Sequence, residues 1–149
     1  MKKFQFNLDT VLRYKQQVLD NMQNEYAAAL ARVREQEGIL AALEGRYRDL
    51  NAGFREAEAA GITVADAMGY EMGLRVLEGE IQRAEVKLEQ LRQEAEERRL
   101  RLVAARQDAA ALEKLREHQW DDYQKAVQKQ EEQFIDELVS NTRAAASLS

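Results

Sequence analysis

Apolar residues recur along the first third of the chain at alternating steps of four and three residues. The positions in this register are Leu8, Leu12, Lys15, Leu19, Met22, Tyr26, Ala29, Val33, Gln36, Leu40, Leu43, Tyr47, Leu50 and Phe54. Such spacing places a narrow apolar stripe on one face of a helix, and the stripe needs a partner helix to cover it. Asn7 is a candidate N-cap because its side chain can accept a backbone hydrogen bond. We therefore expect a coiled-coil helix from about residue 7 to residue 58.

Turn signals follow the end of this stripe. Gly61 is suited to the left-handed conformation that commonly ends a helix. Thr63 followed by Asp66 fits a capping box at the start of a new helix. We expect a turn over about residues 59–65. One continuous helix through Gly61 is the alternative.

A second stripe with the same spacing begins at Leu77. Its members are Leu77, Ile81, Ala84, Leu88, Leu91, Ala95, Leu102, Ala105, Ala109 and Leu112, with Arg98 at one core position. The register shifts near Leu112 and continues through Arg116, Trp120, Tyr123, Val127, Phe134 and Leu138, a stutter that locally underwinds a coiled coil. We expect a second helix over about residues 66–140 and a frayed tail over 141–149.

Two stripes joined by a tight turn predict an all-α fold, a long two-helix antiparallel coiled-coil hairpin in which residues 1–149 make a single rod. Folding back would place Phe54 opposite Tyr70, and Tyr26 opposite Arg98. At the far end, Leu8 would lie opposite Arg116. Residues from about 118 to 140 would then extend beyond the first helix, as an overhanging C-terminal end without an intramolecular partner.

The overhang carries many apolar side chains, and exposed apolar surface of this density usually marks an interaction site. The predicted contact residues at this end are Phe4, Phe6, Trp120, Tyr123, Val127, Phe134 and Leu138. Self-association through the overhang and packing on residues 1–6 are the alternatives. A second contact surface is predicted at the hairpin tip, because two helices cannot bury all of Leu50, Phe54, Met68, Tyr70, Met72 and Leu74. The predicted contact residues there are Leu50, Phe54, Met68, Tyr70, Met72 and Leu77. Methionine makes such a surface adaptable.

Composition supports long helices and argues against several classes of partner. The chain has 149 residues without proline or cysteine, and its 22 basic and 27 acidic side chains are interspersed. The lack of a basic stripe argues against nucleic-acid binding, and no apolar run reaches the ~20 residues that span a bilayer. The N-terminus lacks the apolar region of a secretory signal. We expect a cytoplasmic protein that neither binds nucleic acid nor inserts directly into a membrane.

Candidate catalytic and metal-binding chemistry is sparse. His118 is the only histidine, and with Asp122 it would offer only two ligands on an exposed helix. No phosphate-binding glycine motif occurs, and carboxylates on a solvated helix lack a cleft that would shift their pKa values. We therefore expect no enzymatic activity, no metal site and no cofactor.

The N-terminal sequence MKKFQFNLDTVLRYKQQ resembles the start of the flagellar export protein FliJ family. The resemblance is carried by Phe4, Phe6, Leu8, Val11, Leu12 and Arg13, followed by about 130 residues of heptads in two helices. Chain length and the two-helix division match along the whole sequence. The stalk proteins of virulence-type secretion systems are related and share the coiled coil.

The resemblance implies a non-enzymatic coiled coil similar to the central stalk subunit of rotary ATPases. It implies a cytoplasmic location at the periphery of the inner-membrane export apparatus. The implied partners are the hexameric export ATPase, its regulator, the export-gate membrane protein and export chaperones, with the free ends in the ATPase ring and the tip toward the gate. Gly69 and Gly73 stand where bulkier residues are expected, so the tip residues do not transfer directly. The alternative is a structural coiled-coil homodimer of another system, parallel and with Gly61 helical.

Overall fold

The computed structural model describes residues 2–148, and these form two α-helices without a strand. Helix α1 runs over Asp9–Ala60 and helix α2 over Val64–Leu148. The chain divides into two compact units. The hairpin unit is Asp20–Val103, and the terminal unit combines the chain up to Leu19 with the chain from Ala104 onward.

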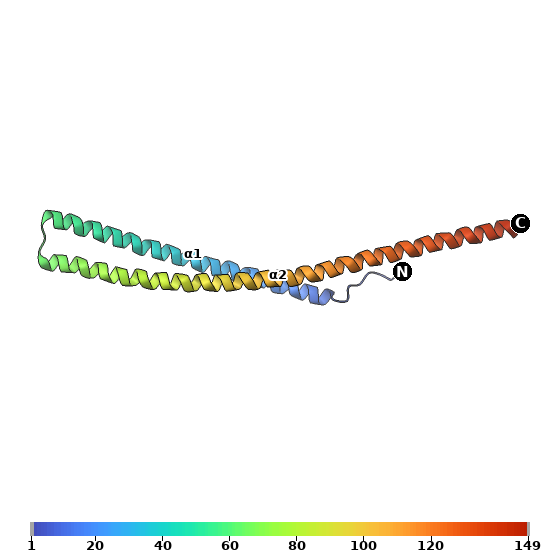
Figure 1. Ribbon diagram of the computed structural model, residues 1–149, viewed down its shortest axis with the longest axis horizontal. Helices are drawn as coiled ribbons and strands as arrows, with labels where there is room; N and C mark the ends of the chain where they lie inside the picture. The colour runs from blue at the N-terminus through green and yellow to red at the C-terminus, as the bar shows by residue number, and fades with distance from the viewer. Residues whose placement is uncertain (1, 149) are drawn as a thin grey trace. The chain divides into compact units, whose positions relative to one another are not determined.

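In the hairpin unit, the two helices run antiparallel on either side of the short connection seen in Figure 1. Its core contains the buried residues Ala29, Val33, Leu88 and Ala95, with Leu30, Leu40 and Leu91 packed against them. All of these except Leu30 are stripe positions, which explains why two amphipathic helices pair here. The predicted all-α fold and two-helix hairpin are confirmed.

Contacts across the hairpin unit follow the expected register closely. The Phe54 and Tyr70 rings lie 5.1 Å apart between centroids. Arg98, expected opposite Tyr26, pairs its guanidinium with the carboxylate of the adjacent Glu25 at 3.0 Å. A long cation at a stripe position can reach past the seam to a carboxylate.

The connection between the helices uses the predicted turn residues. Gly61 has a φ of 94°, a conformation that only glycine adopts without strain. Its N–H donates to the Glu58 carbonyl at 3.2 Å. The Asp66 N–H donates to Thr63 Oγ1 at 3.1 Å, so Thr63 caps α2. Between α1 and α2 only residues 61–63 are non-helical, and the continuous helix through Gly61 is excluded.

In the terminal unit, α1 begins two residues later than the sequence predicts. The Leu12 N–H donates to the Leu8 carbonyl at 2.8 Å, so Leu8 and not Asn7 stands at the N-cap position. The Asp9 N–H donates to the Phe6 carbonyl at 3.0 Å and turns the chain out of the helix. Leu8 is 37% exposed although it lies on the predicted stripe. The first stripe is thus buried or half-buried from Leu12 onward.

Helix α2 extends to Leu148, beyond the expected end near Ser140. The Thr142 hydroxyl donates to the Leu138 carbonyl at 2.7 Å, inside this last segment. Alanines at 144–146 have the highest helix propensity, which explains the continuation without a stripe. Residue 149 lies outside the described residues. Within residues 2–148, neither helix holds a stretch that is long and apolar enough to cross a membrane.

Candidate functional site

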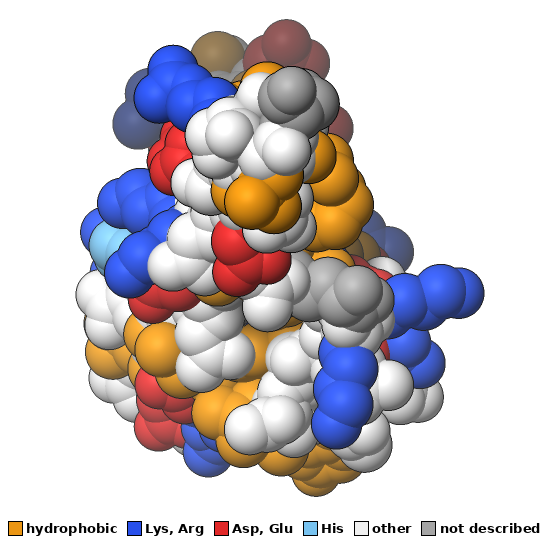
Figure 2. All heavy atoms as spheres, turned by 90° about the vertical axis from the view of Figure 1, so that its right-hand side faces the viewer, with side chains coloured by type: hydrophobic (Ala, Val, Ile, Leu, Met, Phe, Trp, Pro, Cys, Tyr) orange, Lys and Arg blue, Asp and Glu red, His pale blue; other side chains and the backbone are white. Residues whose placement is uncertain are grey.

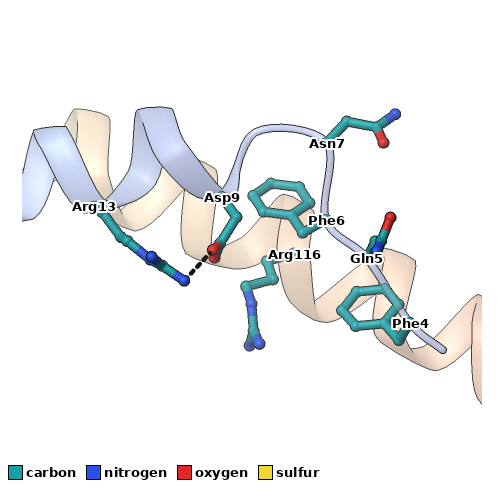
Figure 3. Close-up of a pocket in the computed structure, with 7 residues that line it drawn as sticks. All are labelled: Phe4, Gln5, Phe6, Asn7, Asp9, Arg13 and Arg116. Carbon is teal, nitrogen blue, oxygen red and sulfur yellow. Dashed lines mark ion pairs between the residues drawn. The ribbon is translucent and has the colours of Figure 1, made fainter.

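Residues 2–6 form a non-helical segment that crosses α2 in the terminal unit, and we call it the N-terminal strap (Figure 3). The Phe4 ring meets the Trp120 ring edge-on, with centroids 5.0 Å apart and planes 73° apart. It also lies 5.6 Å from the Tyr123 ring. The Tyr123 hydroxyl donates to the Lys2 carbonyl at 2.7 Å. Phe6, the second aromatic residue of the strap, is buried at 7% exposure.

The strap corrects one expectation from the sequence. Residues 118–140 were expected to lack an intramolecular partner, and this is wrong for Trp120 and Tyr123. Of the two alternatives, self-association and packing on the opening residues, the structure shows the second, with residues 2–6 against Trp120 and Tyr123. The reason is geometric, because a non-helical chain spans up to ~3.3–3.6 Å per residue and a helix only ~1.5 Å. The strap therefore reaches further along α2 than the same residues would in a helix.

Arg116 belongs to the same cluster. Its guanidinium carbon lies 5.8 Å from the centre of the Phe4 ring, within cation–π range. The sequence predicts Arg116 opposite Leu8, and in the structure Arg116 contacts Phe4 of the strap. Arg116 also lines an open groove of about 540 Å³ with Phe4, Gln5, Phe6, Asn7, Asp9 and Arg13. In this groove Arg13 pairs with Asp9 at 2.8 Å, and both side chains are solvent-exposed to a large degree (Figure 3).

The strap is held with little net free energy. Ordering its backbone costs about 1–2 kcal/mol per residue, or about 5–10 kcal/mol over residues 2–6. Burial of Phe6 contributes about 1.5–3 kcal/mol, and each of the two Phe4 ring contacts about 0.5–1.5 kcal/mol. The Tyr123 hydrogen bond adds about 0.5–1.5 kcal/mol and the cation–π contact about 0.5–1 kcal/mol. The favourable contributions and the cost of ordering are of similar size, so release of the strap changes the free energy little.

Beyond the strap, α2 presents an uncovered apolar face. We define the end stripe as Trp120, Tyr123, Val127, Phe134 and Leu138, which share one helix face because they are three, four or seven residues apart. Phe134 is 62% exposed and Leu138 is 50% exposed. Ile135 and Val139, at 57% and 43%, widen the apolar surface. Figure 2 looks from the side where the C-terminus lies and shows hydrophobic side chains exposed among charged ones.

A shallow groove runs along the beginning of the end stripe. It has a volume of about 480 Å³ and is lined by Trp120, Tyr123, Gln124, Val127, Gln128 and Glu131. Trp120 and Tyr123 stack with centroids 5.7 Å apart and planes 25° apart, so they present one aromatic surface. Strap residues therefore contact the same two rings that line this groove. The five end-stripe residues predicted from the sequence do lie on one surface, with Phe4 and Phe6 at its beginning.

The residues predicted at the hairpin tip divide between two faces. Leu50, Phe54, Tyr70 and Leu77 are half-buried. Met68 and Met72 are 63% and 70% exposed. A row at four-residue spacing on α2 unites the two methionines with Val64 and Val76, which are 77% and 55% exposed. The sequence analysis missed both valines, although this spacing could have identified them.

Gly73 allows close packing at the tip. A Cβ atom there would come within 3.0 Å of Leu50 Cδ2, so the absence of a side chain lets the helices approach. An open groove of about 470 Å³ lies nearby, lined by Leu50, Ile62, Ala65, Asp66, Gly69 and Tyr70. The tip therefore offers a groove and an exposed Met–Val row as separate features.

The shifted pKa values arise from hydrogen bonds between exposed side chains. Arg99 donates to both carboxylate oxygens of Glu96, at 2.6 and 2.9 Å. This hydrogen bonding lowers the pKa of Glu96 below its ordinary value and raises that of Arg99. Tyr47 donates its hydroxyl to Glu78 at 3.2 Å, which raises the pKa of the phenol. Among residues 2–148, no group of three or more His, Cys, Asp or Glu side chains is placed to hold a metal ion, and His118 is exposed.

Comparison with known proteins identifies the family. The chain matches the family described as Flagellar FliJ protein over residues 4–147. No curated protein and no solved structure matches it significantly. The match begins at Phe4, in the strap, and extends through the end stripe almost to the end of α2. The chain, with its two-helix hairpin and aromatic N-terminal segment, therefore belongs to the FliJ family of flagellar export proteins.

Proposed function

We propose that the protein is a non-enzymatic stalk and coupling component of the flagellar type III export apparatus. In this proposal it binds the hexameric export ATPase, promotes its assembly or activity, and links it to the export gate and to substrate chaperones. The observation that carries the proposal is the end stripe, where Phe134 and Leu138 are half or more exposed on a helix. Membership of the FliJ family supports the flagellar setting.

The geometry of the terminal unit suits insertion into a ring. A single helix with its side chains is about 10–12 Å wide, which is narrow enough for the central opening of a hexamer. Burial of Phe134 and Leu138 against the ring would remove apolar surface from water and would favour binding. The charged side chains on the remaining faces keep the free end soluble. Contact with the ring then requires no catalytic group on this chain.

The hairpin tip is the proposed contact for the export gate. Its exposed row of Met68, Met72, Val64 and Val76 offers adaptable apolar surface. The ATPase regulator and the export chaperones are the further proposed partners, without assigned residues. The proposed location is cytoplasmic, peripheral to the inner-membrane export apparatus, and the proposed contacts include neither nucleic acid nor direct membrane insertion.

Substitution within the end stripe tests the ATPase contact. The double variant F134A/L138A removes two exposed side chains and should leave the helical content unchanged. Its affinity for the hexameric ATPase should fall at least about tenfold, because truncation of an anchor residue near the centre of an interface costs about 2 kcal/mol or more. Isothermal titration against the purified ATPase, with circular dichroism of each variant, makes the measurement.

The matched control is V86A/L100A, which removes two side chains of α2 that are each 55% exposed in the hairpin unit. This control should bind the ATPase like the unmodified protein. Equal affinity of F134A/L138A and the control would show that the end stripe is not the ATPase contact. Self-association of the unmodified protein that F134A/L138A abolishes, without ATPase binding, would favour the structural homodimer instead.

A further inference from the structure

The first part of the end stripe is partly covered by this chain, and Trp120 remains 41% exposed beside the strap. Phe4 packs against Trp120 and Tyr123, and the Tyr123 hydroxyl bonds the backbone of Lys2. The remaining members of the stripe receive no such cover, and Phe134 stays 62% exposed. The strap therefore sits on one end of a longer surface that continues past it.

We propose that the strap is a displaceable cover of the Trp120–Tyr123 pair, and that an extended partner segment with an aromatic anchor takes its place. This rests on the proposed function, in that the ATPase supplies the segment. Displacement would extend the available docking surface from Val127–Leu138 to the whole end stripe. Phe4 would act as the cover residue, and the partner would contact the Trp120 and Tyr123 rings that it leaves.

The bound strap indicates the chemistry of the segment that replaces it. Phe4 shows that the surface accepts an aromatic ring edge-on to Trp120. The Lys2 carbonyl shows that Tyr123 can donate to an extended backbone. A segment that replaces the strap therefore needs an aromatic side chain and a free backbone carbonyl at the spacing that Phe4 and Lys2 have in the strap.

The strap is suited to release because its attachment is local and weakly biased. Residues 2–6 precede α1 and are not helical, so their departure leaves every helical hydrogen bond in place. A surface that is open only part of the time binds its partner with an affinity reduced by the open fraction. Weakening the strap should therefore increase the affinity for the partner, whereas weakening the docking surface should decrease it.

Trp120 is the only tryptophan, so its fluorescence reports the strap in the full chain. In the variant Phe4→Ala, acrylamide quenching of Trp120 should rise about twofold, and affinity for the hexameric ATPase should rise about threefold to tenfold. Tyr14→Ala is the matched control, since Tyr14 is an aromatic residue of α1 with 64% exposure. The control should change neither quenching nor affinity.

Unchanged quenching in Phe4→Ala would overturn the cover. Increased quenching with affinity equal to or lower than that of the control would overturn displacement, while leaving the proposed function intact. If no form of the protein binds the ATPase, the proposed function fails, and a peptide decides the inference. The peptide with the sequence of residues 2–7 should then restore protection of Trp120 in Phe4→Ala at millimolar concentration, and the same peptide with both phenylalanines replaced by alanine should not. Equal effects of the two peptides would overturn the inference.

Discussion

Gln36 and Lys15 are the two polar residues on the first stripe, and the structure accommodates them differently. Gln36 is only 4% exposed, and its side-chain amide donates to the Ala84 carbonyl at 3.2 Å. Lys15 is half-buried and directs its ammonium to Asp108 at 3.6 Å. A long aliphatic stem can cover apolar surface while its charge reaches water, but a buried amide needs a partner inside. Gln36 is therefore the polar group that fixes local register in the hairpin unit.

Replacement of Gln36 by leucine should stabilise the protein and weaken its register. The Ala84 carbonyl remains in the helical ladder of α2, so the substitution leaves no acceptor stranded. A polar residue at a core position specifies pairing at a cost in stability, and we expect Q36L to raise the free energy of unfolding by about 0.5–1.5 kcal/mol. Urea denaturation measures this change, and light scattering measures any new association.

The control is Gln23→Leu, at an exposed position of α1 in the same unit. Exposed substitutions usually change stability by no more than about 0.5 kcal/mol. A lower free energy of unfolding in Q36L than in the unmodified protein would show that the buried hydrogen bond stabilises more than an apolar contact does.

The ion pair of Glu96 with Arg99 makes the stability of the fold depend on pH. Its bidentate hydrogen bonds from Arg99 hold its pKa below the ordinary value of 4.5 in the folded chain. A lowered folded-state pKa means that the pair stabilises the fold above the ordinary pKa and loses this contribution as the pH falls through the folded value. In R99Q, an NMR titration of the Glu96 carboxyl carbon should show a higher pKa. An identical titration in both proteins would contradict the bidentate pair in solution.

Each helix is defined at its ends by local backbone chemistry. Gly61 ends α1 in a left-handed conformation and Thr63 caps α2 with its hydroxyl. At the other end, Leu8 occupies the N-cap position of α1 and offers no side-chain acceptor. The tertiary contacts of the strap determine this start, because the preceding residues are drawn onto α2. The helix ends at Gly61 and Thr63 can be predicted because they depend on local chemistry, whereas the start of α1 depends on packing.

The two glycines Gly61 and Gly38 should respond to alanine in opposite directions. Gly61 has a φ of 94°, where an alanine is strained by about 1–2 kcal/mol, so G61A should lower the free energy of unfolding by that amount. Gly38 lies inside α1 with open space around it, so G38A should raise the free energy of unfolding by about 0.5–1 kcal/mol. Thermal and urea unfolding of both variants provide the comparison. Equal shifts in the same direction would mean that the turn does not require the left-handed conformation.

At the scale of the whole molecule, the two units differ in how fully their helices are partnered. The hairpin unit pairs α1 with α2 around buried Ala29, Val33, Leu88 and Ala95. In the terminal unit, every residue from Gln128 to Leu148 is exposed. An isolated helical segment is marginal in water, because most helical stability comes from packing of an apolar face. The end of α2 is thus the part whose stability depends most on a partner.

Hydrogen exchange should reveal this difference. We expect backbone amides over residues 130–148 to exchange within seconds to minutes, because that segment can open locally without disturbing a core. Amides around Leu88 and Ala95 should exchange far more slowly, as they open only with the hairpin unit. Mass spectrometry of the deuterated chain measures both, and addition of the ATPase should protect the first segment. Equal protection of both segments in the free protein would show that the end of α2 has a partner in solution.

The sequence by itself determined the two helices, their turn and the face that each buries. Periodicity is a local property, so the spacing of Leu12, Val33, Leu88 and Leu102 sufficed to identify buried positions. The turn followed from Gly61, since no other residue adopts its conformation as readily. The end-stripe residues also followed from spacing, because helical geometry alone places them on one face.

Only the tertiary structure decided what covers that face. The contact between Phe4 and Trp120 joins residues far apart in sequence, and no local pattern indicates that the chain before α1 lies against α2. Likewise, the tip residues divide between inner and outer faces only once α1 lies against α2. Local spacing determines the face on which a side chain lies, but whether that face meets water, the other helix or the strap depends on packing between distant segments.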